Sequence, residues 1–227
     1  SGLQSPGRTS VAPIFEHGGG RGATGCVVIS PPVFLSEEEA LQIIKEELGE
    51  AGIDLDHKLA RELPGVVGNC TEWYYVNMLA QFEEYATDGN MSDSDIENMR
   101  SHFLELQNRA DLESEIVPIQ TDAESKMPPV AIQFISRGDC GKYRAKEAGY
   151  SSVTDYDSKN IAIRLAEAIG EQSSEEMFVG IFYDPLTNSY WLSKQEGVVQ
   201  DPKECSIAEL RLQAKDFVAW LKEQEAI

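Results

Sequence analysis

Short apolar runs alternate with longer amphipathic stretches along this 227-residue chain. A run of β-branched and aromatic residues that ends at Gly, Pro or polar residues is typical of a buried strand. The runs at 26–30, 130–135 and 177–183 fit this description and predict three strands. Two shorter patterns, at 53–59 and 190–192, predict a further strand and a hairpin partner for 177–183.

Five other stretches repeat their apolar residues every three or four positions, the period of an amphipathic helix. They lie at 36–49, 71–86, 92–112, 158–169 and 206–224. The first has the clearest boundaries, because Ser36 and Glu39 match a capping box and Gly49 follows the last apolar residue. Asp157 is the predicted N-cap of the fourth helix.

The third helix has a polar start and a predicted inner face. Ser92 or Asp93 is its expected N-cap, and it ends near Leu112. Its apolar side chains are expected to face the protein interior: Ile96, Met99, Phe103 and Leu106.

The order of these elements predicts the α+β class, with a mixed β-sheet covered by amphipathic helices. Residues 1–25 are rich in glycine and poor in apolar pattern, which predicts an extended, partly mobile leader before a single domain at 26–227. Pro64-Gly65 and Gly68 predict a turn. The polar segment 121–129, with two adjacent prolines, marks the best place for a subdomain boundary, and 142–157 reads as a polar loop.

Charge narrows the range of partners. The chain has 39 acidic and 19 basic residues, a formal net charge of −20. Such a surface repels phosphate backbones and anionic lipid headgroups, so we expect no nucleic-acid partner. Excess acidity for solubility explains the charge better than a specific cation site does. No apolar run approaches the roughly eighteen residues of a membrane span, so we expect a protein that does not span the membrane.

The start of the chain carries neither an initiating Met nor a signal peptide, which suggests a trimmed product. Together with the acidity, this favours a secreted, periplasmic or cell-envelope protein of bacterial type, with a cytoplasmic location as the alternative. The four cysteines, Cys26, Cys70, Cys140 and Cys205, are widely spaced. Metal and cluster motifs need close spacings, so we expect no metal and no cofactor. Four cysteines are compatible either with two disulfides or with four free thiols.

Several short motifs match the residue types of known sites but lack the other motifs that those sites require. Residues 20–27 resemble the glycine-rich loop of protein kinases, but no other kinase motif accompanies them. The stretch 17–20, His-Gly-Gly-Gly, resembles the oxyanion-hole segment of lipases and esterases, yet the chain has no G-x-S-x-G elbow. Residues 137–139 spell Arg-Gly-Asp, which a tight turn after the preceding strand explains. We interpret all three as chance matches.

Cys70 is the strongest candidate for chemistry. It precedes a predicted helix, whose N-terminus favours the thiolate. Residues 68–73, Gly-Asn-Cys-Thr-Glu-Trp, resemble the nucleophile region of transglutaminase-like and papain-type enzymes, which implies a histidine partner. Only His17, His57 and His102 are available. His102 falls on the solvent side of a predicted helix, whereas these families place their histidine on a strand.

Two functional hypotheses follow. The first is a non-catalytic extracytoplasmic domain that binds a small molecule or a protein through aromatic and acidic surface. The aromatic candidates are Trp73, Tyr74, Tyr75, Tyr183, Tyr190 and Trp191. The second is a cysteine-dependent hydrolase or transferase that uses Cys70 with a histidine such as His102. The lack of a complete catalytic set in the sequence favours the first, in which Cys70 is buried or disulfide-bonded.

Overall fold

A four-stranded mixed sheet forms the centre of the computed structural model, which describes residues 7–25, 31–67, 92–112, 115–142, 153–187 and 201–227. The strand order is β1 (Ser10–Val11), β8 (Phe178–Tyr183), β6 (Pro129–Ile135), β5 (Ala123–Lys126). β1, β8 and β6 run parallel, and β5 pairs antiparallel with β6. This is the α+β architecture that the sequence predicts.

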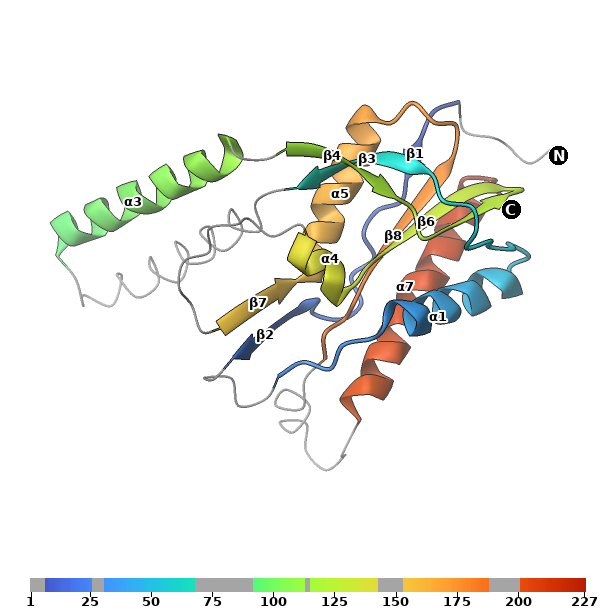
Figure 1. Ribbon diagram of the computed structural model, residues 1–227, viewed down its shortest axis with the longest axis horizontal. Helices are drawn as coiled ribbons and strands as arrows, with labels where there is room; N and C mark the ends of the chain where they lie inside the picture. Colours follow the sequence, from blue (N-terminus) through green and yellow to red (C-terminus); the bar gives the residue numbers. More distant parts are fainter. Residues whose placement is uncertain (1–6, 26–30, 68–91, 113–114, 143–152, 188–200) are drawn as a thin grey trace.

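Helices cover both faces of this sheet (Figure 1). α1 (Glu37–Glu50) and α7 (Pro202–Glu223) pack on one face, and α5 (Ser158–Gln172) packs on the other. Strand alternation explains the division, because successive side chains point to opposite faces. Ile132 and Phe134 of β6 join the core with α1 and α7, while Ala131 and Ile135 join the core with α5.

Two antiparallel ribbons lie beside the central sheet (Figure 1). One pairs β3 (Glu62–Val67) with β4 (Glu115–Gln120) and packs against α5. The other pairs β2 (Arg21–Gly25) with β7 (Val153–Asp157). The remaining described helices are the short α4 (Arg137–Lys142), which follows β6, and α3 (Asp93–Leu112), which extends away from the sheet.

Local sequence signals explain the helix starts. The Ser36 Oγ accepts from the amide of Glu39, and the Glu39 carboxylate accepts from the amide of Ser36, which completes the predicted capping box. Asp157 caps α5 by accepting from the amide of Asn160. α7 begins four residues before the predicted start of 206, because Asp201 is its N-cap and a proline occupies the first turn.

The glycine-rich N-terminal stretch contains two strands that the sequence analysis did not predict. The amides of Ser10 and Ala12 donate to the carbonyls of Met177 and Val179, which adds β1 to the edge of the sheet. Thr9 and Ala12 are buried. A sheet edge supplies hydrogen-bond partners to any extended segment, so a two-residue strand needs little apolar pattern of its own.

The turn predicted from Pro64-Gly65 and Gly68 is wrong at its first two residues, which lie inside β3, with Pro64 opposite Pro118. Gly68 lies outside the described residues. The backbone of Arg61 and Thr121 makes a hydrogen bond at the start of this ribbon. Hydrogen-bonded and non-hydrogen-bonded pairs alternate in an antiparallel ribbon, which makes the Pro64–Pro118 pair non-hydrogen-bonded. Neither proline therefore needs an amide proton at this point.

Two other expectations are corrected. Residues 53–59 form only an isolated bridge, between Asp56 and Glu124, and not a strand. The expected loop at 142–157 contains β7 at its end. The segment 121–129 contains β5 and the turn into β6, and the subdomain boundary suggested there stays a prediction. The predicted elements at 26–30, 71–86 and 190–192 lie outside the described residues.

The helix α3 has its predicted bounds, whereas its predicted inner face is contradicted at Met99. Ser92 caps it by accepting from the amide of Asp95. Of the four residues expected to face inward, Met99 is 37% exposed and Ile96 is half-buried. The side chains of Phe103 and Leu106 are outside the described part of the chain. Helical periodicity identifies an apolar stripe without identifying what covers it.

Candidate functional site

Polar residues whose side chains could take part in binding or catalysis lie together at the carboxyl ends of the parallel strands. β6 ends at Ile135 and is followed by Ser136, and β8 ends at Tyr183 and is followed by Asp184. In open α/β sheets, ligands bind outside this edge. A ligand site is therefore expected at this edge of the sheet.

Asp184 is fully buried at this edge, and its carboxylate accepts hydrogen bonds from two backbone amides. Its Oδ2 accepts from the amide of Leu35 at 2.9 Å, and its Oδ1 accepts from the amide of Leu186 at 3.1 Å. Burial raises the pKa of its carboxyl group to about 6, and the two amide hydrogen bonds act in the opposite direction. The side chain thus holds the segments on both sides of it in place.

Ser158, the first residue of α5, links two segments at the same edge. Its Oγ lies 2.6 Å from the carbonyl oxygen of Asp184 and 3.0 Å from that of Gly20, and donates to them. The side chain is completely buried. A hydroxyl proton shared between two carbonyls holds backbone together, which is a structural role.

The Arg-Gly-Asp tripeptide forms the first turn of α4 and not the expected tight turn. The Asp139 Oδ2 accepts from the amide and the hydroxyl of Ser136 at 2.9 and 2.8 Å, and the Asp139 amide donates to the Ser136 Oγ. Asp139 is buried. This reciprocal capping faces the carboxylate inward, so the tripeptide does not present its acid group to a partner.

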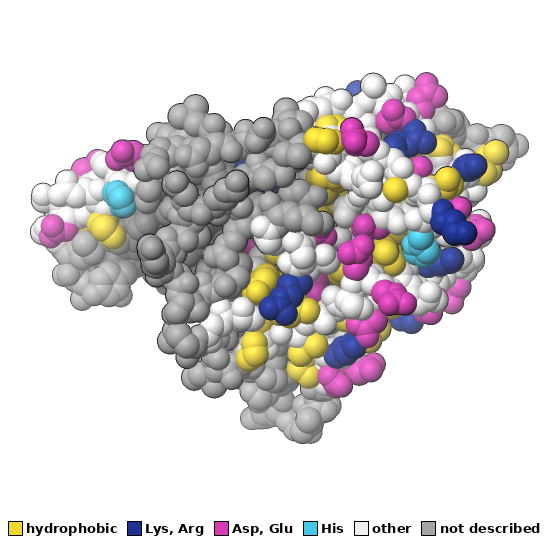
Figure 2. Space-filling view, viewed as in Figure 1, with side chains coloured by type: hydrophobic (Ala, Val, Ile, Leu, Met, Phe, Trp, Pro, Cys, Tyr) yellow, Lys and Arg dark blue, Asp and Glu magenta, His cyan; other side chains and the backbone are white. Residues whose placement is uncertain are grey.

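Arg137, in contrast, faces solvent and stacks on two aromatic rings. Its guanidinium carbon lies 4.6 Å from the centre of the Phe34 ring and 5.7 Å from that of Tyr156. The two rings meet edge to face, with centres 4.9 Å apart. We call these three residues the Arg137 platform. Figure 2 shows basic and hydrophobic side chains together in the region that Figure 1 assigns to α4 and β7.

The glycines that suggested nucleotide or oxyanion binding have packing roles. Gly18 and Gly20 adopt positive φ values of 84° and 63°. A Cβ at Gly20 would lie 2.8 Å from the Tyr183 ring, and one at Gly18 would lie 3.0 Å from the Cα of Pro185. The amide of Gly20 donates to the carbonyl of Pro185. Close packing and backbone conformation thus explain this run.

The three histidines are not gathered at the carboxyl edge. His17 Nε2 lies 2.7 Å from Asp216 Oδ2 on α7, and its Nδ1 lies 3.9 Å from Glu209 Oε2. His57 is exposed in a turn, and His102 is exposed on α3, as predicted. Cys70 lies outside the described residues, so its surroundings stay untested.

Of the aromatic candidates from the sequence, only Tyr183 lies in the described part of the chain. It is fully buried, and its Oη donates to the carbonyl of Gly18 at 3.0 Å. Burial raises the pKa of its hydroxyl group. Tyr183 is therefore a core residue. Phe34 and Tyr156 were not predicted as site residues, because they carry no motif and meet only in the folded chain.

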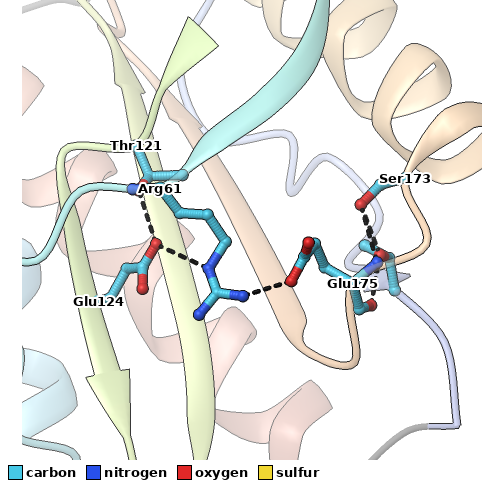
Figure 3. A network of polar contacts seen from close by, with 6 residues as sticks. Arg61, Thr121, Glu124, Ser173 and Glu175 are labelled. Carbon is cyan, nitrogen blue, oxygen red and sulfur yellow. Dashed lines mark hydrogen bonds and ion pairs between the residues drawn. The ribbon is translucent and has the colours of Figure 1, made fainter. Parts of the chain in front are cut away.

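The opposite edge of the sheet holds a second polar cluster (Figure 3). Arg61 pairs with Glu175 through Nη1 and with Glu124 through Nε at 3.4 Å. The Thr121 Oγ1 donates to Glu124 and accepts from the amide of Arg61. Thr9 donates to the carbonyl of Glu175. These contacts join the β3–β4 ribbon, β5 and the start of β8, which is a structural arrangement.

The chain matches no family model, no curated protein and no solved structure. Among the residues that the structure describes, no group of three or more His, Cys, Asp or Glu side chains is placed to hold a metal ion. None of the described helices has both the length and the apolar character to cross a membrane.

Proposed function

We propose that the protein is a non-catalytic, extracytoplasmic binding domain that recognises a small molecule or a protein, and not nucleic acid. The observation that carries this proposal is the difference between buried and exposed polar groups at the carboxyl edge. The carboxylates and hydroxyls that an enzyme would use there, on Asp184, Asp139 and Ser158, are buried and bonded to backbone. The group that faces solvent is the Arg137 platform.

This arrangement suits recognition. A guanidinium that stacks on aromatic rings combines a fixed positive charge with apolar contact area, which is a frequent composition of binding surfaces. General acid–base chemistry, by contrast, needs a proton donor or acceptor that reaches the substrate. The net charge of −20 supports the part of the proposal that excludes nucleic acid.

Chemical-shift mapping of the full chain tests the proposal. A panel of small charged and neutral aromatic compounds is added to the wild type and to Cys70→Ser, and the compounds are followed by one-dimensional NMR. We expect saturable shifts of the amide signals of Phe34, Arg137 and Tyr156 in both proteins, with every compound recovered unchanged. Conversion of a compound such as p-nitrophenyl acetate by the wild type, but not by Cys70→Ser, would instead establish the cysteine enzyme.

The acidic composition supports the extracytoplasmic part of the proposal. Cell fractionation of the full-length gene product, with a cytoplasmic and a secreted marker as controls, tests it directly. We expect the protein with the secreted marker; recovery with the cytoplasmic marker would remove this part and leave the binding role standing.

A further inference from the structure

We infer that the Arg137 platform binds a carboxylate group carried by an apolar or aromatic molecule, an inference that rests on the binding role proposed above. The platform consists of Arg137 with the rings of Phe34 and Tyr156, at 4.6 and 5.7 Å from the guanidinium carbon. Three properties lead to this ligand class: the orientation of the donors, the rigidity of the support and the charge of the surroundings.

The guanidinium has hydrogen-bond donors to offer. Stacking engages the flat face of the group, while its N–H donors point outward in its plane. Arg137 is exposed, and among the described residues no carboxylate lies within ion-pair distance of it. Two parallel N–H donors match the two oxygens of a carboxylate, which is the preferred partner geometry of arginine.

The rings below the guanidinium are held in position by the fold. The amide of Leu35, next to Phe34, donates to the buried carboxylate of Asp184 at 2.9 Å. The Oη of Tyr156 accepts from Thr24 Oγ1 at 3.3 Å across the β2–β7 ribbon. A support that is already ordered reduces the entropy that a ligand must remove on binding.

The electrostatic surroundings disfavour a ligand with more than one negative charge. Asp157 lies next to Tyr156 in the chain, Asp184 anchors the segment of Phe34, and the whole chain carries −20. A phosphate dianion or a strongly acidic peptide would meet more repulsion here than a monoanion does. The half-buried rings of Phe34 and Tyr156 offer contact to an apolar or aromatic group beside the carboxylate.

Phenylacetate is the probe for this inference, because it joins one carboxylate to one aromatic ring. Phenylacetamide keeps the shape and removes the charge, and inorganic phosphate keeps an anion without the ring. Binding to the full chain is measured by the amide shifts of Phe34, Arg137 and Tyr156. We expect phenylacetate to bind at least about tenfold more tightly than phenylacetamide, as for a hydrogen bond to a charged group, and more tightly than phosphate.

Two variants of Arg137 separate charge from geometry. Arg137→Gln should weaken phenylacetate binding by roughly tenfold or more, and Arg137→Lys should restore only part of it, because an ammonium lacks the planar pair of donors. Arg100→Gln is the matched control, since it removes the same charge from exposed α3, where Arg100 pairs with Glu97. It should bind phenylacetate like the wild type. Circular dichroism establishes that each variant is folded.

Equal binding of phenylacetamide and phenylacetate at these three residues would overturn the carboxylate inference and leave the proposed binding role intact. Tighter binding of phosphate, or unchanged phenylacetate binding by Arg137→Gln, would overturn it as well. Failure of the binding role itself has a different signature, which is conversion of an added compound by a Cys70-dependent reaction.

Discussion

Arg61 and Arg137 lie at opposite edges of the central sheet, and their guanidinium groups have different partners. Arg61 pairs with the carboxylates of Glu124 and Glu175 and joins segments distant in sequence. Arg137 stacks on Phe34 and Tyr156 and faces solvent. An arginine whose donors already reach carboxylates contributes to the fold, whereas one supported by rings keeps its donors for a ligand.

The acidic residues differ between the edges in the same way. At the edge with Arg61, Glu124 bonds to a side chain, the hydroxyl of Thr121, and pairs with the arginine. At the edge with Arg137, Asp184 accepts from backbone amides. The comparison predicts that buried carboxylates bonded to backbone stabilise the Arg137 edge, whereas ion pairs stabilise the Arg61 edge. Four measurements test this difference.

The largest effect is expected for Asp184→Ala. The substitution leaves the buried amides of Leu35 and Leu186 without acceptors, and an unsatisfied buried group costs about 1–3 kcal/mol, so we expect a loss of about 2–4 kcal/mol in the free energy of unfolding. Urea denaturation measures it. Asp56→Ala is the control, because exposed Asp56 also accepts from a backbone amide, that of Lys58. Equal losses in the two variants would show that Asp184 is not a buried anchor.

Asp184 should also impose a pH dependence. Burial raises the pKa of its carboxyl group in the folded protein from 3.8 to about 6, so the folded state binds the proton more tightly than the unfolded state does. Its contribution to stability is therefore complete below about pH 4 and is lost as the pH rises through about 6, an effect on the order of 2–3 kcal/mol. Asp184→Asn has no such titration.

The measurement is the free energy of unfolding of wild type and Asp184→Asn between pH 4 and 7. The other carboxyl groups are common to both proteins, so only the difference between the two curves matters. We expect the wild type to lose stability relative to Asp184→Asn as the pH rises. A constant difference would mean that Asp184 titrates normally.

The third effect concerns the segment that carries Phe34. A Cβ at Gly22 would lie 2.8 Å from the Cβ of Pro32, whereas one at Gly19 would meet nothing within 4 Å. Gly22→Ala must displace a rigid proline ring, and we expect it to cost about 1–3 kcal/mol, as overpacking does. Gly19→Ala should be neutral or slightly stabilising. Thermal unfolding of the two variants measures this, and equal melting temperatures would contradict tight packing of β2 on Pro32.

Local signals in the sequence account for the parts of the fold that were predicted. Ser36 with Glu39, and Asp157, cap the helices that their side chains predict. The pairing of Pro64 with Pro118 was not predictable in this way, because the register of two distant strands decides whether an amide is needed. Nor was strand β1, whose hydrogen bonds come from the edge of β8.

The candidate site shows the same limit more strongly. Arg137 follows a well-predicted strand, and the rule for carboxyl ends of parallel strands would have placed it at a binding edge. The rings of Phe34 and Tyr156 carry no local signal, because α4, β7 and the segment before α1 meet only through tertiary packing. Sequence motifs drew attention to Arg-Gly-Asp instead, in which Asp139 is buried as a helix cap.

The smallest effects distinguish the two arginines directly. Arg61→Gln removes two ion pairs, one of them to Glu124, whose side chain is only 10% exposed, and we expect a loss of about 1 kcal/mol. Arg137→Gln removes exposed cation–ring contacts, and the expected loss is about 0.5 kcal/mol. Salt separates them: at 1 M NaCl the Debye length is about 3 Å, so the loss in Arg61→Gln should shrink. The loss in Arg137→Gln should change little, since its contacts are short-range and include apolar stacking. Urea denaturation at 0.1 and 1 M NaCl measures both, and a greater salt sensitivity of Arg137→Gln would reverse the roles assigned to the two arginines.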